Sequence, residues 1–315
     1  MMSKVAVIGG GTGLSTLLCG FKKLPFEISA IVSVCDDGSS TGRLRKEFNT
    51  PAVGDIRKVL ISLSEDEENV RKLLDYRFDT FSDLDGHALG NLILTGANEI
   101  CGNMSDAVEL TASILNLRGK VIPLTEDNVT LVGEMKDGTI VYGEHNITEY
   151  DGKIEKVFYE SEPKVNNDVL KAIREADAIV LSMGSIFTSI IPNLLCKEVI
   201  KEIDNASGKI IYVCNIMTQP GETDDFSVSD HIKLINSYLG KRKIDVAVVN
   251  SGDIDSDIIL KYATTEQKDL VLFDRDNIDK LNIHIVENDY ILIKNGCIRH
   301  NALRVALDII SYLLD

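Results

Sequence analysis

Two adjacent carboxylates, Asp36 and Asp37, are the residues of this sequence that most directly suggest chemistry. They follow the apolar run Ile28 to Cys35, which predicts a buried strand. Carboxylates at a strand end can hold a magnesium ion, accept hydrogen bonds from sugar hydroxyls or act as a general base. Asp36 and Asp37 are therefore candidate magnesium ligands, candidate ligand-binding residues and candidate catalytic residues.

The small hydroxyl residues after this pair are also candidate ligand-binding residues: Ser39, Ser40 and Thr41. An Asx turn followed by a helix N-cap at one of these hydroxyls is the alternative interpretation.

A glycine-rich turn in the stretch VAVIGGGTGLSTLL, which begins at Val5, is the second candidate element. Its backbone can approach an anion at the start of a helix, so the following residues are expected to bind a ligand: Gly10, Gly11, Thr12 and Gly13. The turn departs from the dinucleotide fingerprint, because the third glycine counted from Gly9 and Gly11 falls on Leu14. We expect the position that lets the helix pack close to the strand to be lost. A glycine-rich turn without a ligand is the alternative.

Polar residues also follow three later predicted strands, in the stretches SMGSIFTSIIPN, CNIMTQPGET and VNSGD. The carboxyl ends of parallel strands meet at one edge of a sheet, so five such ends predict a shared ligand cleft. The further candidate ligand-binding residues are Gly184, Ser185, Thr188, Asn193, Asn215 and Thr218, together with Asn91 and Arg299. Glu222 is a candidate partner for a sugar hydroxyl. Helix capping is the alternative for the loops.

The elements that position these residues predict an α/β fold, a Rossmann-like, doubly wound and mainly parallel sheet. Strands are expected at 4–8, 28–35, 178–183, 209–215 and 245–250, and helices at 13–23, 56–63, 88–101, 168–175, 192–203, 228–239 and 301–314. Alternating short runs between Val121 and Tyr159, separated by Asp-Gly pairs, predict an inserted antiparallel β-hairpin lobe. We divide the chain into a nucleotide-binding half (1–120), this insertion (121–160) and a second half completing the same sheet (161–315).

Composition excludes several classes of protein. The 315 residues carry a formal net charge of −16, which opposes nonspecific binding to nucleic acid or anionic membranes. No apolar stretch is long enough for a signal peptide or a membrane span, so we expect a cytoplasmic protein. The six cysteines are scattered and predict free thiols. The chain has no Walker motif, nucleophile elbow or zincin helix.

The stretches VIGGGTGLSTLL, DDGSSTGRLR, GDIRKVL, GHALGNLIL, SMGSIFTSIIPNLL, CNIMTQPGET and VVNSG together resemble the YvcK family, the gluconeogenesis factors. This family belongs to the superfamily of CofD, the 2-phospho-L-lactate transferase. The resemblance covers nearly the whole chain and implies a Rossmann-like fold. It also implies a UDP-sugar ligand such as UDP-N-acetylglucosamine and a role in cell shape, cell-wall synthesis and gluconeogenic growth.

By the same resemblance, Asp36 and Asp37 fall on the acidic pair at the metal and acceptor site of CofD. The residues that fall on its nucleotide-contacting loops are Gly11, Thr12, Ser185, Thr188 and Asn193.

Three functional hypotheses follow. The first is a regulator that binds a nucleotide sugar, requires no cofactor and signals to an unidentified protein partner. The alternative is a magnesium-dependent transferase of the CofD type, and an NAD-dependent oxidoreductase rests on the glycine turn alone. Whether the chain catalyses a reaction and whether it forms a homo-oligomer stay open.

Overall fold

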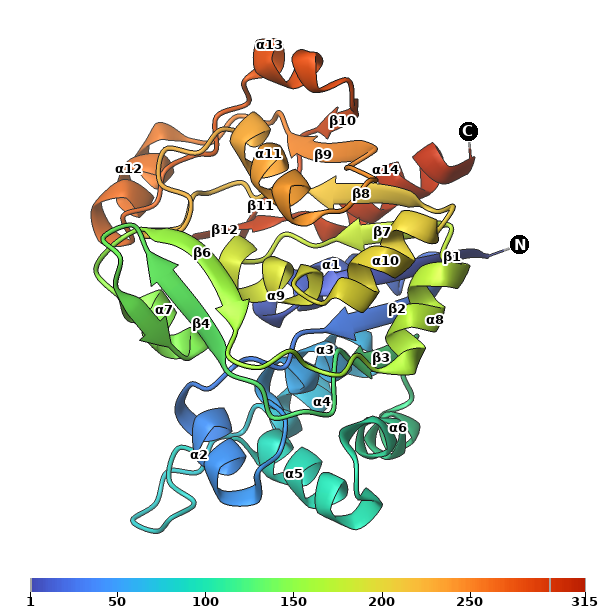
Figure 1. The fold of residues 1–315 in the computed structure, drawn as a ribbon, viewed down its shortest axis with the longest axis vertical. Helices are drawn as coiled ribbons and strands as arrows, with labels where there is room; N and C mark the ends of the chain where they lie inside the picture. Colours follow the sequence, from blue (N-terminus) through green and yellow to red (C-terminus); the bar gives the residue numbers. More distant parts are fainter. Residues whose placement is uncertain (1, 295, 315) are drawn as a thin grey trace.

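The computed structural model describes residues 2–294 and 296–314, and a seven-stranded parallel sheet runs through its centre (Figure 1). The strand order is β10-β9-β8-β7-β1-β2-β3, and every neighbouring pair is parallel. The strands are β1 (Ser3–Gly9), β2 (Phe26–Val32), β3 (Lys120–Pro123), β7 (Ala178–Leu181), β8 (Lys209–Val213), β9 (Val246–Asn250) and β10 (His284–Asn288). This arrangement confirms the predicted Rossmann-like α/β fold.

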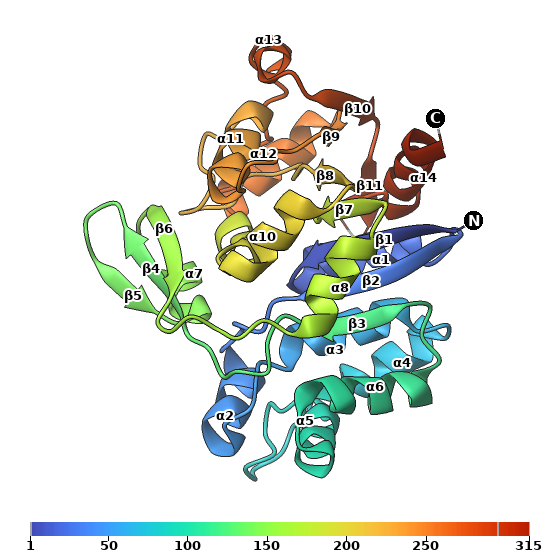
Figure 2. The ribbon, with the colours of Figure 1, turned by 45° about the vertical axis from the view of Figure 1, so that its right-hand side comes forward.

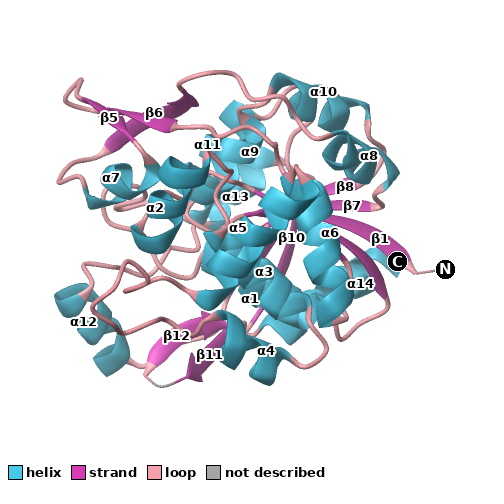
Figure 3. Ribbon diagram, turned by 90° about the horizontal axis from the view of Figure 1, so that it is seen from below, coloured by secondary structure: helices cyan, strands magenta, loops and turns pink. Residues whose placement is uncertain are grey.

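Helices cover both faces of the sheet, so its central strands are apolar along nearly their whole length. The view from below shows α1 (Gly11–Phe21) and α14 (Ala302–Leu314) on one side, with α8 (Asn167–Glu175) and α10 (Lys197–Asn205) on the other (Figure 3). The remaining helices are α2 (Ser39–Phe48), α3 (Gly54–Leu63), α4 (Glu67–Leu74), α5 (Leu89–Cys101), α6 (Met104–Leu115), α7 (Glu144–Glu149), α9 (Ile191–Leu194), α11 (Val228–Tyr238), α12 (Ser256–Thr265) and α13 (Arg275–Ile278).

A small antiparallel sheet projects from this body, with the order β5-β4-β6 (Figure 2). Its strands are β4 (Leu131–Met135), β5 (Ile140–Tyr142) and β6 (Ile154–Tyr159). The predicted antiparallel character is confirmed, but the prediction that all of 121–159 forms hairpins is wrong. Residues 120–123 pair in parallel with β2 in the main sheet, and residues 144–149 form α7. A short apolar run does not reveal whether its partner is local or distant in sequence.

The predicted helix over 192–203 is also wrong as one element. A π-helix, η1 (Ile186–Ile190), leads into α9, and α10 then begins after Cys196, whose backbone is extended. The stretch between the second strand and residue 56, which showed no periodicity, contains α2. A hairpin of β11 (Ile291–Lys294) and β12 (Cys297–His300) and a short 3₁₀ turn, η2 (Asp279–Leu281), complete the elements.

The six cysteines are unpaired. Over residues 2–294 and 296–314, no helix has both the length and the apolar character that crossing a membrane requires.

Candidate functional site

The chain changes direction across the sheet at β1, which lies between β2 and β7. From β1 it runs outward through β2 to β3, and it later returns to build β7, β8, β9 and β10 on the other side. In parallel α/β sheets, ligands bind beyond the carboxyl ends of the strands at such a switch point. The predicted polar strand ends of β1, β7 and β8 meet here.

A cavity of about 270 Å³ lies at this switch point, and we call it the strand-end cleft. The turn after β1 contributes Gly10, Thr12, Gly13 and Thr16 to its lining. The loops after β7 and β8 contribute Gly184, Ser185, Ser189, Asn215 and Gln219. The outer wall comes from α12, the loop after it and β12, and includes Tyr262, Glu266, Lys268, Arg299 and His300.

The glycines of the first turn permit a close approach between α1 and the loop after β7. A Cβ atom built at Gly13 would lie 1.9 Å from the carbonyl oxygen of Met183, so only glycine fits. The expectation that close packing is lost at Leu14 is wrong, because Gly13 provides it one position earlier. Leu14 instead packs in the core with none of its surface exposed. Gly11 has a φ of +57°, a left-handed conformation that glycine adopts without strain.

The amino terminus of α1 opens toward the cleft, and the buried Asp55 carboxylate on α3 accepts a hydrogen bond from its Gly11 N–H. Its N-cap residue is Gly10, and its first turn contains no acidic side chain. The N–H groups at a helix start lack partners within the helix and carry a partial positive charge. This turn therefore has the properties of an anion-binding site.

Two cations line the opposite wall of the cleft. Arg299 is exposed, and Lys268 is paired with Glu266 at 2.8 Å. His300 is neutral, since burial lowers its pKa to about 4, and its Nε2 donates to the Cys214 carbonyl at 3.0 Å. Because Glu266 balances the charge of Lys268, Arg299 is the residue of this wall that favours an anionic ligand, in a chain with a net charge of −16.

A buried carboxylate, Glu222, organises the loop after β7. It accepts hydrogen bonds from the Ser185 hydroxyl, at 2.5 and 2.8 Å, and from the Phe187 N–H at 3.2 Å. Burial raises the pKa of Glu222 to about 7, although these donors oppose the shift. The Ser185 oxygen in turn accepts from the Thr188 N–H at 3.1 Å. Glu222 thus fixes the conformation of this loop through hydrogen bonds from its buried side.

Of the other residues predicted for these loops, one lines the cleft and three are buried outside it. Asn215 lines the cleft, its amide donates to the Gly184 carbonyl at 3.0 Å, and its Oδ1 atom has no partner among the described residues. Thr188 and Asn193 are buried behind the cleft, and Asn193 donates to the Ser189 carbonyl. Thr218 is also buried, where its hydroxyl accepts from the Asp269 N–H. These last three do not line the cleft.

Four carboxylates gather beside the first turn, and we call Asp36, Asp37, Asp55 and Glu144 the acidic group. A Cβ at Gly10 would lie 2.8 Å from an Asp55 oxygen, so the group adjoins the strand-end cleft. Burial raises the pKa of Asp55, and Lys58 opposes this from 3.0 Å. The pKa of Glu144 lies well above its usual range, because the side chain is desolvated and the other three carboxylates repel its charge.

Asp36 and Asp37 both accept hydrogen bonds from other groups of the protein. Asp36 accepts from the Thr41 hydroxyl at 2.9 Å and from the Gly38 N–H at 3.0 Å. Asp37 accepts from the His145 N–H at 2.8 Å, a contact with the antiparallel lobe. Among the residues that the structure describes, no three His, Cys, Asp or Glu side chains are arranged to hold a metal ion.

Ser40 and Asn91, both buried, belong to a hydrogen-bond network that needs no ligand. The Ser40 hydroxyl lies 3.0 Å from Nδ1 of His87 and accepts from the Asn91 amide at 3.1 Å. The Asn91 oxygen accepts from Arg57 at 2.8 Å. Ser39 is exposed with a φ of +39°. These contacts hold α2 against α5.

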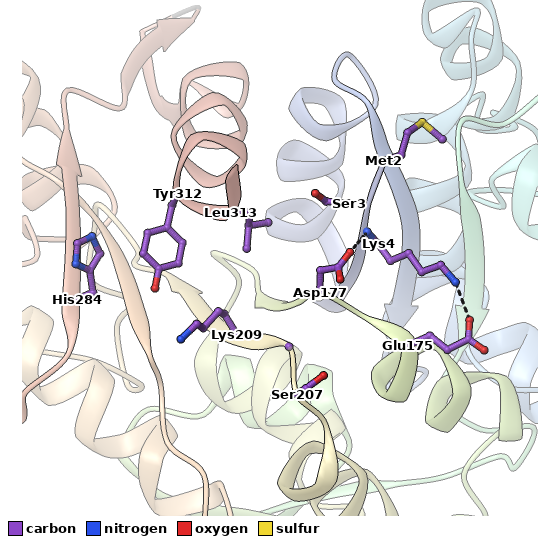
Figure 4. Close-up of a pocket in the computed structure, with 11 residues that line it drawn as sticks. Met2, Ser3, Lys4, Glu175, Asp177, Ser207, Lys209, His284, Tyr312 and Leu313 are labelled. Carbon is purple, nitrogen blue, oxygen red and sulfur yellow. Dashed lines mark hydrogen bonds and ion pairs between the residues drawn. The ribbon is translucent and has the colours of Figure 1, made fainter. Parts of the chain in front are cut away.

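A larger depression of about 1000 Å³ lies at the opposite edge of the sheet (Figure 4). The Lys4 ammonium there pairs with Glu175 at 3.0 Å, and the Lys4 N–H donates to Asp177 at 2.8 Å. These residues stand at the start of β1 and before β7, where parallel sheets do not place their ligands. Size alone therefore does not make this depression the functional site.

Several residues of the site were not predicted from the sequence. Asp55 and Glu144 join the acidic group from α3 and α7, and Tyr262 and Lys268 line the cleft from around α12. The stretch GDIRKVL carries a signal for Asp55, because an acidic residue starts a helix there. Nothing in the local sequence indicates the other three.

A parallel sheet with a glycine-rich first turn and a cleft at its switch point defines a Rossmann-like α/β protein. The sequence pattern of the family described as 2-phospho-L-lactate transferase CofD matches residues 5–291, and the chain belongs to this family.

Individual proteins resemble the chain over nearly its full length. The "Gluconeogenesis factor" of Bacillus subtilis (strain 168) is 43% identical over 313 residues, which cover 99% of this chain and 98% of that protein. A "Putative gluconeogenesis factor" of Thermotoga maritima is 44% identical over 87% of each chain. A crystal structure of a UPF0052 family member from Bacillus halodurans superposes with a TM-score of 0.93 at 40% identity, covering 99% of this chain and all of that one.

Proposed function

We propose that the protein is a regulatory protein that binds a nucleotide sugar, specifically a UDP-sugar such as UDP-N-acetylglucosamine, in the strand-end cleft. The observation that carries the proposal is the amino terminus of α1, whose Gly10, Thr12 and Gly13 line the same cleft as Arg299. A diphosphate would lie between N–H groups of this terminus on one side and the Arg299 guanidinium on the other. No cofactor is needed for this binding.

The neutral part of such a ligand has partners in the same cleft. Residues at the cleft wall that do not carry charge, including Tyr262 and Ile298, supply apolar contact. Ser185 and Gly184 shape the floor, because Glu222 holds their loop in place.

The biological role proposed here comes from the relatives. Proteins similar over the whole chain bear the name gluconeogenesis factor, so we assign this chain a role in growth on gluconeogenic carbon sources. We extend this role to cell shape and cell-wall synthesis, since nucleotide-linked amino sugars are precursors of the cell wall. We also propose that the protein acts in the cytoplasm, through a protein partner.

Isothermal titration calorimetry with UDP-N-acetylglucosamine tests the binding. Arg299→Gln is expected to weaken binding about tenfold or more, since a charge-assisted hydrogen bond contributes about 1.5–3 kcal/mol. Arg304→Gln is the matched control, because Arg304 lies outside the cleft and contacts Asp289. Lack of binding by the wild-type protein, or equal effects of the two variants, contradicts the proposal. A titration with NADH tests the alternative that the cleft binds a redox cofactor.

A second candidate function, a magnesium-dependent transferase of the CofD type, is favoured by the acidic group. Its carboxylates repel one another, and Mg²⁺ typically binds one or two carboxylates together with substrate phosphates. Asp36 and Asp37 would hold the ion, which would neutralise negative charge on a diphosphate. Two adjacent carboxylates suit this mode, whereas a site made of protein ligands alone would need more. If Asp36→Asn leaves magnesium-dependent ligand binding unchanged, this candidate fails.

A further inference from the structure

Helix α12 forms part of the outer wall of the strand-end cleft, yet little of it is buried against the rest of the molecule. Figures 1 and 3 show it at the margin of the molecule, next to β12. Of its ten residues, Tyr262 alone is buried, whereas α11 buries five of its eleven residues. A helix with so few buried contacts opens at a lower free-energy cost than the core of a fold.

A small apolar cluster, separate from the main core, holds α12 in place. Its buried members are Ile216 from the loop after β8, Tyr262, and Ile298 of β12, and Ile258 of α12 packs against them. The Tyr262 hydroxyl also accepts a hydrogen bond from the Ile298 N–H at 2.7 Å. Over residues 2–294 and 296–314, no other side chain of α12 forms a hydrogen bond or ion pair beyond its own helix. We call these four residues the α12 latch.

The chain on both sides of α12 is fixed more firmly than the helix itself. Before the helix, the Asn250 side chain accepts from the Tyr290 N–H at 2.9 Å. After it, the Thr218 N–H donates to the Asp269 carbonyl at 2.8 Å, and the Asp269 N–H donates to the Thr218 hydroxyl at 2.9 Å. A weakly held segment between two anchored ends has the arrangement of a hinged lid.

The strand-end cleft is small for the ligand proposed above. Its volume is about 270 Å³, whereas sites for small molecules typically enclose about 300–1000 Å³. A nucleotide sugar combines a base, two sugar rings and a diphosphate, so it needs a volume well within that range. Tyr262 on α12, with Glu266 and Lys268 just after it, lines the cleft. Outward movement of α12 therefore enlarges the cleft.

We propose that α12 is a lid, which opens by release of the α12 latch, admits the nucleotide sugar and closes over it. The identity of the ligand rests on the proposed function, but the opening of the free protein depends on the contacts of α12 alone. Closure returns Tyr262 to the cleft wall, so the ligand leaves only after the lid reopens. The latch then controls how long the ligand stays bound.

Hydrogen–deuterium exchange of the full chain, measured by mass spectrometry, tests the lid. In the free protein, the amides of α12 should exchange at least about 100-fold faster than those of α11. At ten times its dissociation constant, UDP-N-acetylglucosamine should slow α12 exchange about tenfold, since the ligand must leave before the lid opens. Equal exchange of α11 and α12 in the free protein overturns the proposal. Unchanged α12 exchange at a concentration that calorimetry shows to be saturating also overturns it.

Two variants of α12 test whether the latch controls the motion. Ile258→Ser weakens the cluster, and Ile258 does not line the cleft. It should speed α12 exchange in the free protein, and dissociation of the ligand in stopped-flow measurements, by about tenfold. Leu260→Ser is the matched control, because Leu260 is 62% exposed on the same helix. Circular dichroism checks that both variants fold.

Equal α12 exchange in Ile258→Ser and Leu260→Ser overturns the role of the latch. Lack of binding by the wild-type protein refutes the proposed ligand instead. The exchange of the free protein and of the two variants then decides separately whether α12 opens.

Discussion

Substitution of Gly13 by alanine tests how the first turn positions the candidate site. The new Cβ atom would lie 1.9 Å from the Met183 carbonyl oxygen and 2.5 Å from its carbon, and both contacts are with main chain. No side-chain rotation relieves this overlap, so α1 and the loop after β7 must separate. Overpacking of a tight interior typically costs about 1–3 kcal/mol, and we expect a loss of about 2–3 kcal/mol in the free energy of unfolding.

Urea denaturation of Gly13→Ala and Gly96→Ala measures this loss against a matched control. Gly96 is also a helical glycine, but it faces open space, so alanine there should be neutral or stabilise by up to about 1 kcal/mol. The same displacement should weaken binding of UDP-N-acetylglucosamine, because the N–H groups of α1 move. Equal unfolding free energies for the two variants would refute the close approach at Gly13.

Two titrating groups give predictions of opposite sign. The pKa of Glu222 is raised from 4.5 to about 7, so the folded state holds its proton longer, and the free energy of unfolding should fall by about 3 kcal/mol as pH rises between these values. Glu222→Gln should remove this slope in urea denaturation measured from pH 4.5 to 7.5, and parallel profiles for variant and wild type would contradict it. His300 has its pKa lowered from 6.5 to about 4, so its contribution is complete above pH 6.5 and is lost as pH falls toward 4. His300→Gln should reduce the acid sensitivity in that range, and an unchanged profile would count against a neutral imidazole at this position.

The sequence predicted the framework of the fold because burial on both faces leaves a strong local signal. The runs that became β1, β2, β7, β8 and β9 are apolar and end in polar loops, and the order of strands and helices then implies a parallel sheet. The glycine-rich turn was assigned correctly to the start of a helix. The glycine that allows close packing was expected at position 14, because the dinucleotide fingerprint has a fixed spacing between its glycines. In the structure it is Gly13, because that residue lies against the main chain of Met183.

The rest of the site depends on contacts between segments far apart in the sequence. The His145 N–H donates a hydrogen bond to Asp37, which is 108 residues away in the sequence. Neither segment contains a local pattern that predicts this contact. Thr188, Asn193 and Thr218 were selected as polar residues near strand ends, yet their hydrogen bonds are internal. Residue type and position predict that a polar side chain lies near the cleft edge of the sheet, but not whether its partner is the protein or a ligand.

The position of β1 in the sheet also bears on how the chain folds. Val5 pairs with Ile28 on one side, but on the other side it pairs with Ala178, 173 residues along the chain. Such distant pairing is slow, since a long loop must close before its contacts contribute. During synthesis, β1 and β2 form early while one edge of β1 stays open until residues 178–181 have left the ribosome. While that edge is open, β1 can pair with strands of other chains, and the pairing with β7 ends this risk of aggregation.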